Sequence, residues 1–130
     1  MKKTGNNNQA MGRKFVLAWL KKHKYCVIAT SFEGEPWAAT VDYIVDDNLN
    51  IYIATNPNSL KFKNLIKNPV VCLVIDGQSR EGTLQMQGTA SPLKTKGWGE
   101  ANVLIKPKFL IFKKKEEDSN KVTTVELSLN

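Results

Sequence analysis

The sequence predicts a mainly β fold, a six- or seven-stranded antiparallel β-barrel with an N-terminal helix and a short mid-chain helix. Short apolar runs rich in β-forming residues recur along the chain, and turn signals separate them. Most connections between these runs have hairpin length, which favours antiparallel neighbours over a doubly wound sheet. The chain has 130 residues, of which 42% are hydrophobic and 24% charged, so it is long enough for one domain with its own core.

The start of the chain predicts a polar leader and then an amphipathic helix. Residues 1–9 are basic and then polar, so we expect a disordered leader before a single domain over residues 10–130. Between Gly12 and Lys24, four apolar residues share one helical face: Phe15, Val16, Trp19 and Leu20. We expect this face to pack on the barrel.

Seven runs predict strands, over residues 25–30, 37–45, 49–54, 70–75, 83–90, 109–112 and 122–127. A helix is expected over residues 60–67, because good N-cap residues precede it and Asn68-Pro69 ends it. The stretch from Lys94 to Leu104 is compatible with a weak helix that contains Gly97 and Gly99. Residues 113–120 predict a charged turn.

The positive charge of the chain is concentrated near its N-terminus. The formal net charge is +7, and residues 1–24 contain seven Lys and Arg and no Asp or Glu. A nucleic-acid-binding protein usually carries its basic patch on the folded body, with aromatic side chains between the bases, so nucleic acid is not an expected partner. The lysines from Lys94 to Lys115 form a second basic cluster.

Several features favour a cytoplasmic protein without a membrane segment. No apolar run approaches the roughly 18 residues that a membrane span needs, and no apolar segment directly follows the basic start. Cys26 and Cys72 each lie inside an apolar run, so we expect two buried free thiols rather than a disulfide or a metal site.

Catalysis by the protein's own side chains is not indicated. His23 is the only histidine and lies at a lysine-rich helix end. A Ser-His-Asp or Cys-His arrangement would need another histidine, and the chain has none. The carboxylates of Asp46, Asp47 and residues 116–118 lie in expected turns, where solvation explains them. If the protein is an enzyme, a bound cofactor carries the reaction.

The best candidate for a cofactor site is the segment from Thr55 to Lys61, where a strand ends and a helix begins. Free backbone N–H groups at a helix start favour an anion. Thr55 and Ser59 add hydroxyl donors and Lys61 adds a positive charge. This combination predicts a phosphate site.

Five short motifs then occur in a fixed order: Ala29-Thr30, Gly34-Glu35-Pro36, Thr55 to Lys61, Asn68-Pro69 and Gly88-Thr89-Ala90. This series resembles the pyridoxamine 5′-phosphate oxidase-like, FMN-binding split-barrel family. The resemblance implies a split barrel and a small flavoprotein, an FMN-dependent reductase or electron carrier acting on an unknown substrate. It also implies a homodimer, with the flavin where two barrels meet.

The resemblance further implies which residues contact FMN. The phosphate would lie at Thr55, Asn56, Ser59, Leu60 and Lys61, and the flavin ring along Ala39, Thr40 and Val41. Gln85, on a later strand, would reach the flavin. The oxidases have an arginine where this chain has Leu60, and a second arginine is absent from Trp37-Ala38-Ala39-Thr40. Oxidation of vitamin B6 is therefore not expected.

Two other classes of function stay open at this point. The same fold could hold a deazaflavin, a haem or no cofactor, and the lysines of residues 94–115 could meet the polyanionic tail of a deazaflavin. A non-enzymatic barrel could instead bind nucleic acid or protein, through the basic leader and an exposed aromatic residue such as Trp98. Trp37 and Trp98 are also compatible with a core or dimer-interface position, or with stacking on a flavin.

Overall fold

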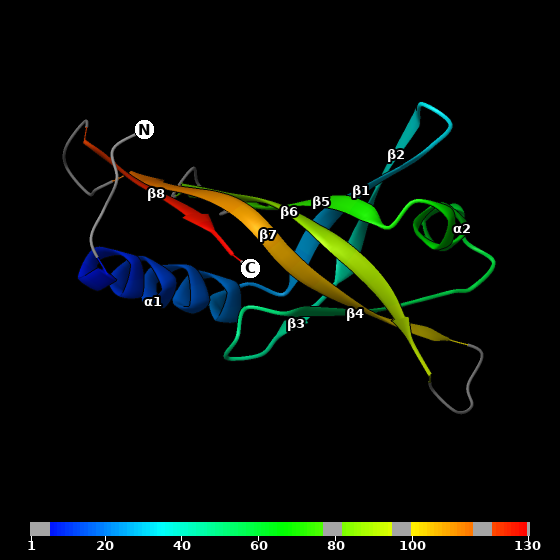
Figure 1. Cartoon of the computed structure of the whole chain (residues 1–130), viewed down its shortest axis with the longest axis horizontal. Helices are drawn as coiled ribbons and strands as arrows, with labels where there is room; N and C mark the ends of the chain where they lie inside the picture. The colour runs from blue at the N-terminus through cyan, green and yellow to red at the C-terminus, as the bar shows by residue number, and fades with distance from the viewer. Residues whose placement is uncertain (1–5, 77–81, 95–99, 116–120, 130) are drawn as a thin grey trace.

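The computed structural model describes residues 6–76, 82–94, 100–115 and 121–129. In sequence order the elements are α1 (Asn6–Lys22), β1 (Tyr25–Phe32), β2 (Glu35–Asp42), β3 (Ile44–Val45), β4 (Ile51–Thr55), α2 (Leu60–Lys67), β5 (Val70–Asp76), β6 (Gly82–Leu93), β7 (Ala101–Lys115) and β8 (Val122–Ser128). Figure 1 shows the strands as one curled sheet, with α1 and α2 at different ends of it.

The strands form a single antiparallel sheet in the order β2-β1-β5-β6-β7-β4-β3, with β8 paired to β7. The long strand β7 makes this branch possible, because its first residues pair with β4 and its last residues pair with β8. The prediction of a mainly β fold, an antiparallel split barrel with an N-terminal and a mid-chain helix, is confirmed, and the sheet is curled as a half-barrel.

A bulge shapes the middle of the sheet. The register between β6 and β7 shifts between Gln87 and Gly88. A Cβ at Gly88 would lie 2.5 Å from the carbonyl oxygen of Lys106, so only glycine lets the two backbones approach this closely. The bulge adds local twist to two long strands and helps the sheet to curl.

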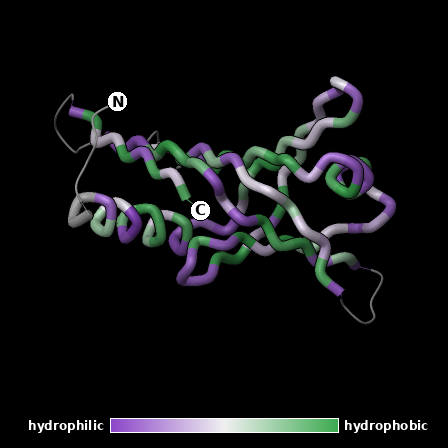
Figure 2. Tube along the Cα trace, viewed as in Figure 1, coloured by the Kyte–Doolittle hydropathy of each residue, from purple (hydrophilic) through white to green (hydrophobic). Residues whose placement is uncertain are grey.

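The core lies between the inner face of the sheet and α1. Alternate residues of most strands are buried, so the apolar side chains of the strands gather on the inner face. Figure 2 shows hydrophobic residues along both the strands and α1. From α1, Val16, Trp19 and Leu20 join this core, and the indole N–H of Trp19 donates to the Ile75 carbonyl at 3.2 Å. Phe15 was expected on the same face but is 50% exposed, because the buried stripe of α1 is narrower than the apolar stripe of its sequence.

Several boundaries differ from the sequence prediction. Helix α1 begins at Asn6 rather than Gly12 and ends at Lys22, so residues 6–9 of the expected leader are helical. Strand β6 continues to Leu93, three residues beyond the expected end at Ala90. Residues 101–104, expected in a weak helix, begin β7, where they pair with β4 and β6. Residues 1–5, 95–99 (with Trp98) and 116–120 lie outside the described part of the chain.

The two cysteines are free, but only one is buried. Cys26 points into the core, and burial raises the pKa of its thiol to about 12. The prediction of a buried Cys72 was wrong, because Val71, Leu73 and Ile75 take the inward positions of β5 and leave Cys72 on the outer face. An uninterrupted apolar run does not show which of its alternate residues point inward.

A single residue, Tyr43, separates β2 from β3, where the sequence predicts one continuous strand. β2 and β3 occupy the two ends of the sheet order, so the chain crosses from one edge of the sheet to the other at this corner. The backbone N–H of Tyr43 donates to the Lys24 carbonyl at 3.0 Å, and its buried phenol donates to the Leu20 carbonyl at 2.6 Å. Burial, together with the nearby Cys26 thiol, raises the pKa of Tyr43.

Replacing Tyr43 by Phe should destabilise the fold by about 1–3 kcal/mol, because the substitution leaves the Leu20 carbonyl at the end of α1 without its buried donor. Urea unfolding followed by circular dichroism measures this change. Tyr25→Phe is the matched control, since Tyr25 is 62% exposed and should unfold like the parent. Equal stability of the two variants would contradict a role for the Tyr43 hydroxyl.

Candidate functional site

The junction between β4 and α2 is held by a compact set of hydrogen bonds. Ser59 is the N-cap of α2, and its hydroxyl accepts from the Phe62 N–H at 3.3 Å. The hydroxyl oxygens of Ser59 and Thr55 are 3.2 Å apart. The Asn56 carbonyl accepts from the Ser59 N–H at 3.0 Å, and the Asn56 side chain accepts from the Asn58 N–H at 2.8 Å. These bonds fix the turn that carries the predicted phosphate segment.

This arrangement leaves several hydrogen-bond donors at the start of α2 available to a ligand. If the buried Thr55 hydroxyl donates to Ser59, the Ser59 hydroxyl keeps its own hydrogen for an outside acceptor. The N–H groups of Leu60 and Lys61 belong to the first turn of the helix, where no intrahelical carbonyl can pair with them. The junction therefore offers neutral donors to an anion without breaking its own capping bonds.

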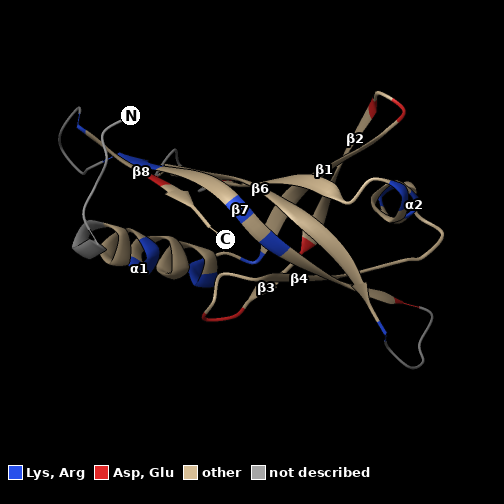
Figure 3. Ribbon diagram, viewed as in Figure 1, with Lys and Arg blue, Asp and Glu red and all other residues tan. Residues whose placement is uncertain are grey.

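The charge of α2 suits the same ligand. The helix carries Lys61, Lys63 and Lys67 and no acidic residue, as Figure 3 shows. Lys67 lies over the Phe32 ring, with its ammonium 4.7 Å from the ring centroid. Lys63 is exposed, whereas Lys61 is partly buried next to the cap. Lys61 is thus the lysine of α2 that lies closest along the chain to the free N–H groups.

The structure brings most, but not all, of the sequence-predicted residues together. Thr55, Asn56, Ser59, Leu60 and Lys61 share the junction, and β2 packs against both β4 and α2. On β2, Thr40 is exposed and Ala39 is half-buried, while the Val41 side chain faces the core, so a ligand would meet only the backbone of Val41.

Gln85 lies apart from this group. It is exposed on β6, and β1 and β5 separate β6 from β2 in the sheet. Three interstrand spacings correspond to about 14 Å along the sheet. Along β7, Gln85 pairs with Ile111, whereas Thr55 pairs with Ala101. These partners are ten residues apart on one strand, or about 33 Å. Within one chain, Gln85 therefore does not share the surroundings of the Thr55–Lys61 junction.

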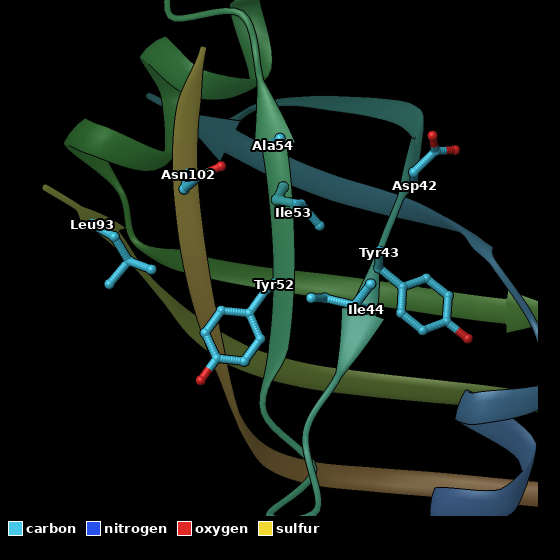
Figure 4. Close-up of a pocket in the computed structure, with 8 residues that line it drawn as sticks. All are labelled: Asp42, Tyr43, Ile44, Tyr52, Ile53, Ala54, Leu93 and Asn102. Atoms are coloured by element: carbon cyan, nitrogen blue, oxygen red, sulfur yellow. The ribbon is translucent and has the colours of Figure 1, made fainter. Parts of the chain in front are cut away.

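Next to the junction lies a cleft of about 380 Å³ that the sequence did not predict. Its lining residues come from the end of β2 and the corner after it, and from β3, β4, β6 and β7: Asp42, Tyr43, Ile44, Tyr52, Ile53, Ala54, Leu93 and Asn102 (Figure 4). Ala54 precedes Thr55 in the chain, so the cleft begins one residue from the candidate anion site. The alternation of β4 was the available signal, because it places Tyr52 and Ala54 opposite the buried Ile51 and Ile53.

One wall of the cleft is fixed by the turn between β3 and β4. The Tyr52 hydroxyl donates to the Asp46 carboxylate at 3.0 Å, and the backbone and side-chain N–H groups of Asn50 donate to the same carboxylate at 3.0 and 3.1 Å. Burial opposes the ionisation of Asp46, but these bonds and one from the Asn48 N–H outweigh it and lower the pKa of Asp46. The hydrogen bond from the Tyr52 hydroxyl to Asp46 raises the pKa of Tyr52. Asp46 is therefore a structural anchor rather than a freely solvated turn residue.

His23 has a structural setting. Its ring packs against Trp19 with centroids 4.4 Å apart, and its Nε2 atom is buried without a hydrogen-bond partner in the described structure. Among the described residues, no group of three His, Cys, Asp or Glu is arranged to hold a metal ion. In the same part of the chain, neither helix is long and apolar enough to cross a membrane.

A family model described as pyridoxamine 5′-phosphate oxidase matches residues 13–126. The chain belongs to this family. The match covers α2, the part of α1 from residue 13 onward and all the strands that build the junction and the cleft, so the resemblance of the ordered motifs is confirmed. No curated protein matches the chain significantly.

Solved structures show the same fold with low sequence identity. General Stress Protein 26 from Bacillus anthracis is 17% identical, covering 90% of this chain and 98% of its own, with a TM-score of 0.74. A FAD-binding protein from Mesorhizobium loti is 16% identical, covering 75% and 88%, with a TM-score of 0.64. A structure titled F420 reductase is 14% identical, covering 72% and 93%, with a TM-score of 0.62. These likenesses show that the chain has the same fold as these proteins.

Asp46→Asn should lower the stability of the fold at neutral pH, and the difference from the parent should shrink in acid. The pKa of Asp46 is lowered in the folded state, so its contribution is present above its ordinary value of 3.8 and is lost as the pH falls through the lower, folded value. Unfolding in urea at a series of pH values measures the difference. Asp47→Asn is the control, because Asp47 forms only an exposed ion pair with Lys21. A pH-independent effect of Asp46→Asn would contradict this account.

Proposed function

We propose that this protein is a small flavoprotein that binds FMN and acts as an oxidoreductase, either a reductase or an electron carrier. The observation that carries the proposal is the junction of β4 and α2, where the Ser59 hydroxyl and the first-turn N–H groups can donate to a ligand and Lys61 lies in the first turn of a helix without acidic residues. A phosphate monoester carries nearly two negative charges and accepts several hydrogen bonds. The donors at the junction match that chemistry.

The edge of β2 supports the placement of the flavin ring. Among the described strands β2 pairs only with β1, so its other edge keeps unpaired N–H and C=O groups. A flavin presents donors and acceptors on its pyrimidine edge, and the backbone of Ala39, Thr40 and Val41 can pair with them without a charged side chain. Bound FMN would supply electron or hydride transfer. The chain would supply binding, orientation and exclusion of water.

Lys61 would be the main side-chain charge at the phosphate. Leu60, where the oxidases have an arginine, is 46% exposed and apolar, and the β2 positions contribute no base. A single charge-assisted hydrogen bond to phosphate contributes about 1.5–3 kcal/mol. FMN binding should therefore be sensitive to this one lysine.

A deazaflavin is the second candidate cofactor. The likeness to the F420 reductase structure supports it, together with the exposed Lys106 and Lys108 on β7, which would suit a polyanionic tail (Figure 3). Haem has less support from this chain, since its one histidine packs against Trp19.

We further propose that the protein is a homodimer. Two cross-strand rows on the outer face of β1, β5, β6 and β7 contain no charged residue: Ala29, Cys72, Gln87 and Phe109, and next to them Val27, Val74, Gln85 and Ile111. Gln85 lies in this face, so the partner subunit can bring a second copy of it toward a flavin that the first chain holds. A stable interface of this kind buries on the order of 1,600 Å².

Lys61→Ala should weaken FMN binding by about 10- to 150-fold, which corresponds to the loss of roughly 1.5–3 kcal/mol. Titrations followed by flavin fluorescence measure the dissociation constants of FMN and of riboflavin. Lys63→Ala is the matched control, because Lys63 is exposed on the same helix and should bind FMN like the parent. Unchanged FMN binding in Lys61→Ala, or a preference of the parent for riboflavin, would refute the phosphate site.

The exposed thiol of Cys72 offers a direct test of the dimer. As the protein concentration rises, sedimentation velocity should show a dimer, and alkylation of Cys72 by iodoacetamide should slow in parallel. Cys26 is an internal control, since its buried thiol has a pKa of about 12 and should stay unmodified throughout. A flavin-loaded monomer at micromolar concentration, or a dimer with undiminished Cys72 alkylation, would count against this interface.

A further inference from the structure

We propose that the cleft beside the paired strands β3 and β4 binds a small apolar molecule that carries a positive charge, and that it discriminates against the matching anion. Describing this ligand as the substrate rests on the proposed oxidoreductase function. The binding itself is a property of the cleft and can be tested in the absence of a flavin.

The shape of the cleft suits a small, flat ligand. Its volume of about 380 Å³ falls in the range typical of small-molecule pockets. The small side chain of Ala54 is exposed on β4, with the larger Ile44, Tyr52 and Leu93 around it (Figure 4). Ile44 is 70% exposed, which is unusual for a large apolar residue beside a cleft that no described segment covers.

The charge of the lining determines the sign of the ligand. Among the described residues that line the cleft, Asp42 is the one charged residue, and none is a lysine, arginine or histidine. The Asp42 side chain is exposed and forms no ion pair with another described residue. Figure 4 shows Asp42 on the opposite side of β4 from Asn102 and Leu93, so the carboxylate stands at one rim and the apolar surface lies beside it. In a chain of net charge +7, this local negative field runs against the overall charge.

The cleft is also preformed. Tyr52 is held by its hydrogen bond to Asp46, and Tyr43 is held by its hydrogen bond to Leu20, so neither ring has to be ordered when a ligand enters. Asn102, from the strand paired with β4, supplies a neutral amide that can donate or accept. A planar hydrocarbon with a cationic substituent would place its ring on the apolar surface and its charge at Asp42.

The cleft and the phosphate junction are therefore adjacent sites that favour ligands of opposite charge. Lys61 and the helix start favour an anion, whereas one residue away the lining around Ala54 offers a carboxylate and apolar surface. A phosphate ester suits the first site and is disfavoured at the second. The proposed substrate is consequently an apolar cation and not a phosphorylated compound.

The test uses three probes with one ring system: 1-naphthylmethylammonium, 1-naphthylmethanol and 1-naphthoate. Binding to the full chain without flavin is followed by amide chemical shifts, with the resonances of Tyr52 and Ala54 as site reporters. The cation should bind about tenfold more tightly than the anion, with the alcohol between them. Asp42→Asn should weaken binding of the cation about two- to fivefold and leave the alcohol unchanged, as expected for one partly exposed ion pair.

Two variants make the result specific to the cleft. Asp76→Asn removes an exposed carboxylate on β5, outside the lining, and should leave all three probes unaffected. Ala54→Leu fills the space over β4 and should weaken the cation and the alcohol alike, at an exposed position where the fold should tolerate it. Equal binding of cation and anion, or insensitivity of the cation to Asp42→Asn, would overturn the proposal. Amide chemical-shift changes that do not include Tyr52 and Ala54 would also overturn it.

The two proposals fail independently. Lys61→Ala should weaken FMN binding and leave the cationic probe unchanged, and Asp42→Asn should do the reverse. If only the expected weakening of FMN binding by Lys61→Ala is not observed, the phosphate site is refuted and the cleft remains a binding site. If only the expected weakening of the cationic probe by Asp42→Asn is not observed, the cleft proposal is refuted and the flavoprotein proposal remains in place.

Discussion

The architecture depends on the corner at Tyr43. The sheet has two terminal strands, β2 and β3, that follow one another in sequence yet lie at opposite ends of the strand order. A chain can make this crossing only if its backbone leaves one ladder before it joins the next. Tyr43 holds the crossing in place from both sides, since its N–H bonds to the segment before β1 and its phenol bonds to the last turn of α1. One side chain thus links the helix, the first strand and the opening of the barrel.

The opening created by this corner positions both candidate sites. Because β2 and β3 do not pair with each other among the described residues, the edge of β2 remains free and β4 lies next to an open space. The end of β4 then leads directly into α2, whose start collects donors around Ser59. The outward residues of β4 form the floor of the cleft, and the same strand ends at the phosphate junction. A rigid strand can therefore hold two adjacent ligands in a fixed relation.

The sequence predicted the parts of this structure that local chemistry determines. The bounds of α2 were predicted correctly, because Ser59 caps the helix and Asn68-Pro69 ends it within a few residues. The split between β2 and β3 could not be predicted, since Tyr43 leaves the strand only because of partners in distant segments. Cys72 was misplaced because apolar neighbours on both sides hide which face of the strand is buried, and Phe15 because the buried stripe of α1 is narrower than its apolar stripe. The cleft combines residues from four separate segments of the chain, and no local pattern brings them together.

Because the junction carries few charges, FMN binding would depend on the proposed dimer. A helix start contributes about 0.3–1 kcal/mol to anion binding, and one lysine contributes roughly 1.5–3 kcal/mol. These contributions alone correspond to weak binding, because association also costs translational and rotational freedom. The remaining affinity has to come from contacts with the ring, and a single chain offers these on one side only, along β2. A second copy that covers the ring would supply the rest. Any ligand that binds the dimer more tightly than the monomer stabilises the dimer by mass action, so flavin and partner subunit would each strengthen the binding of the other.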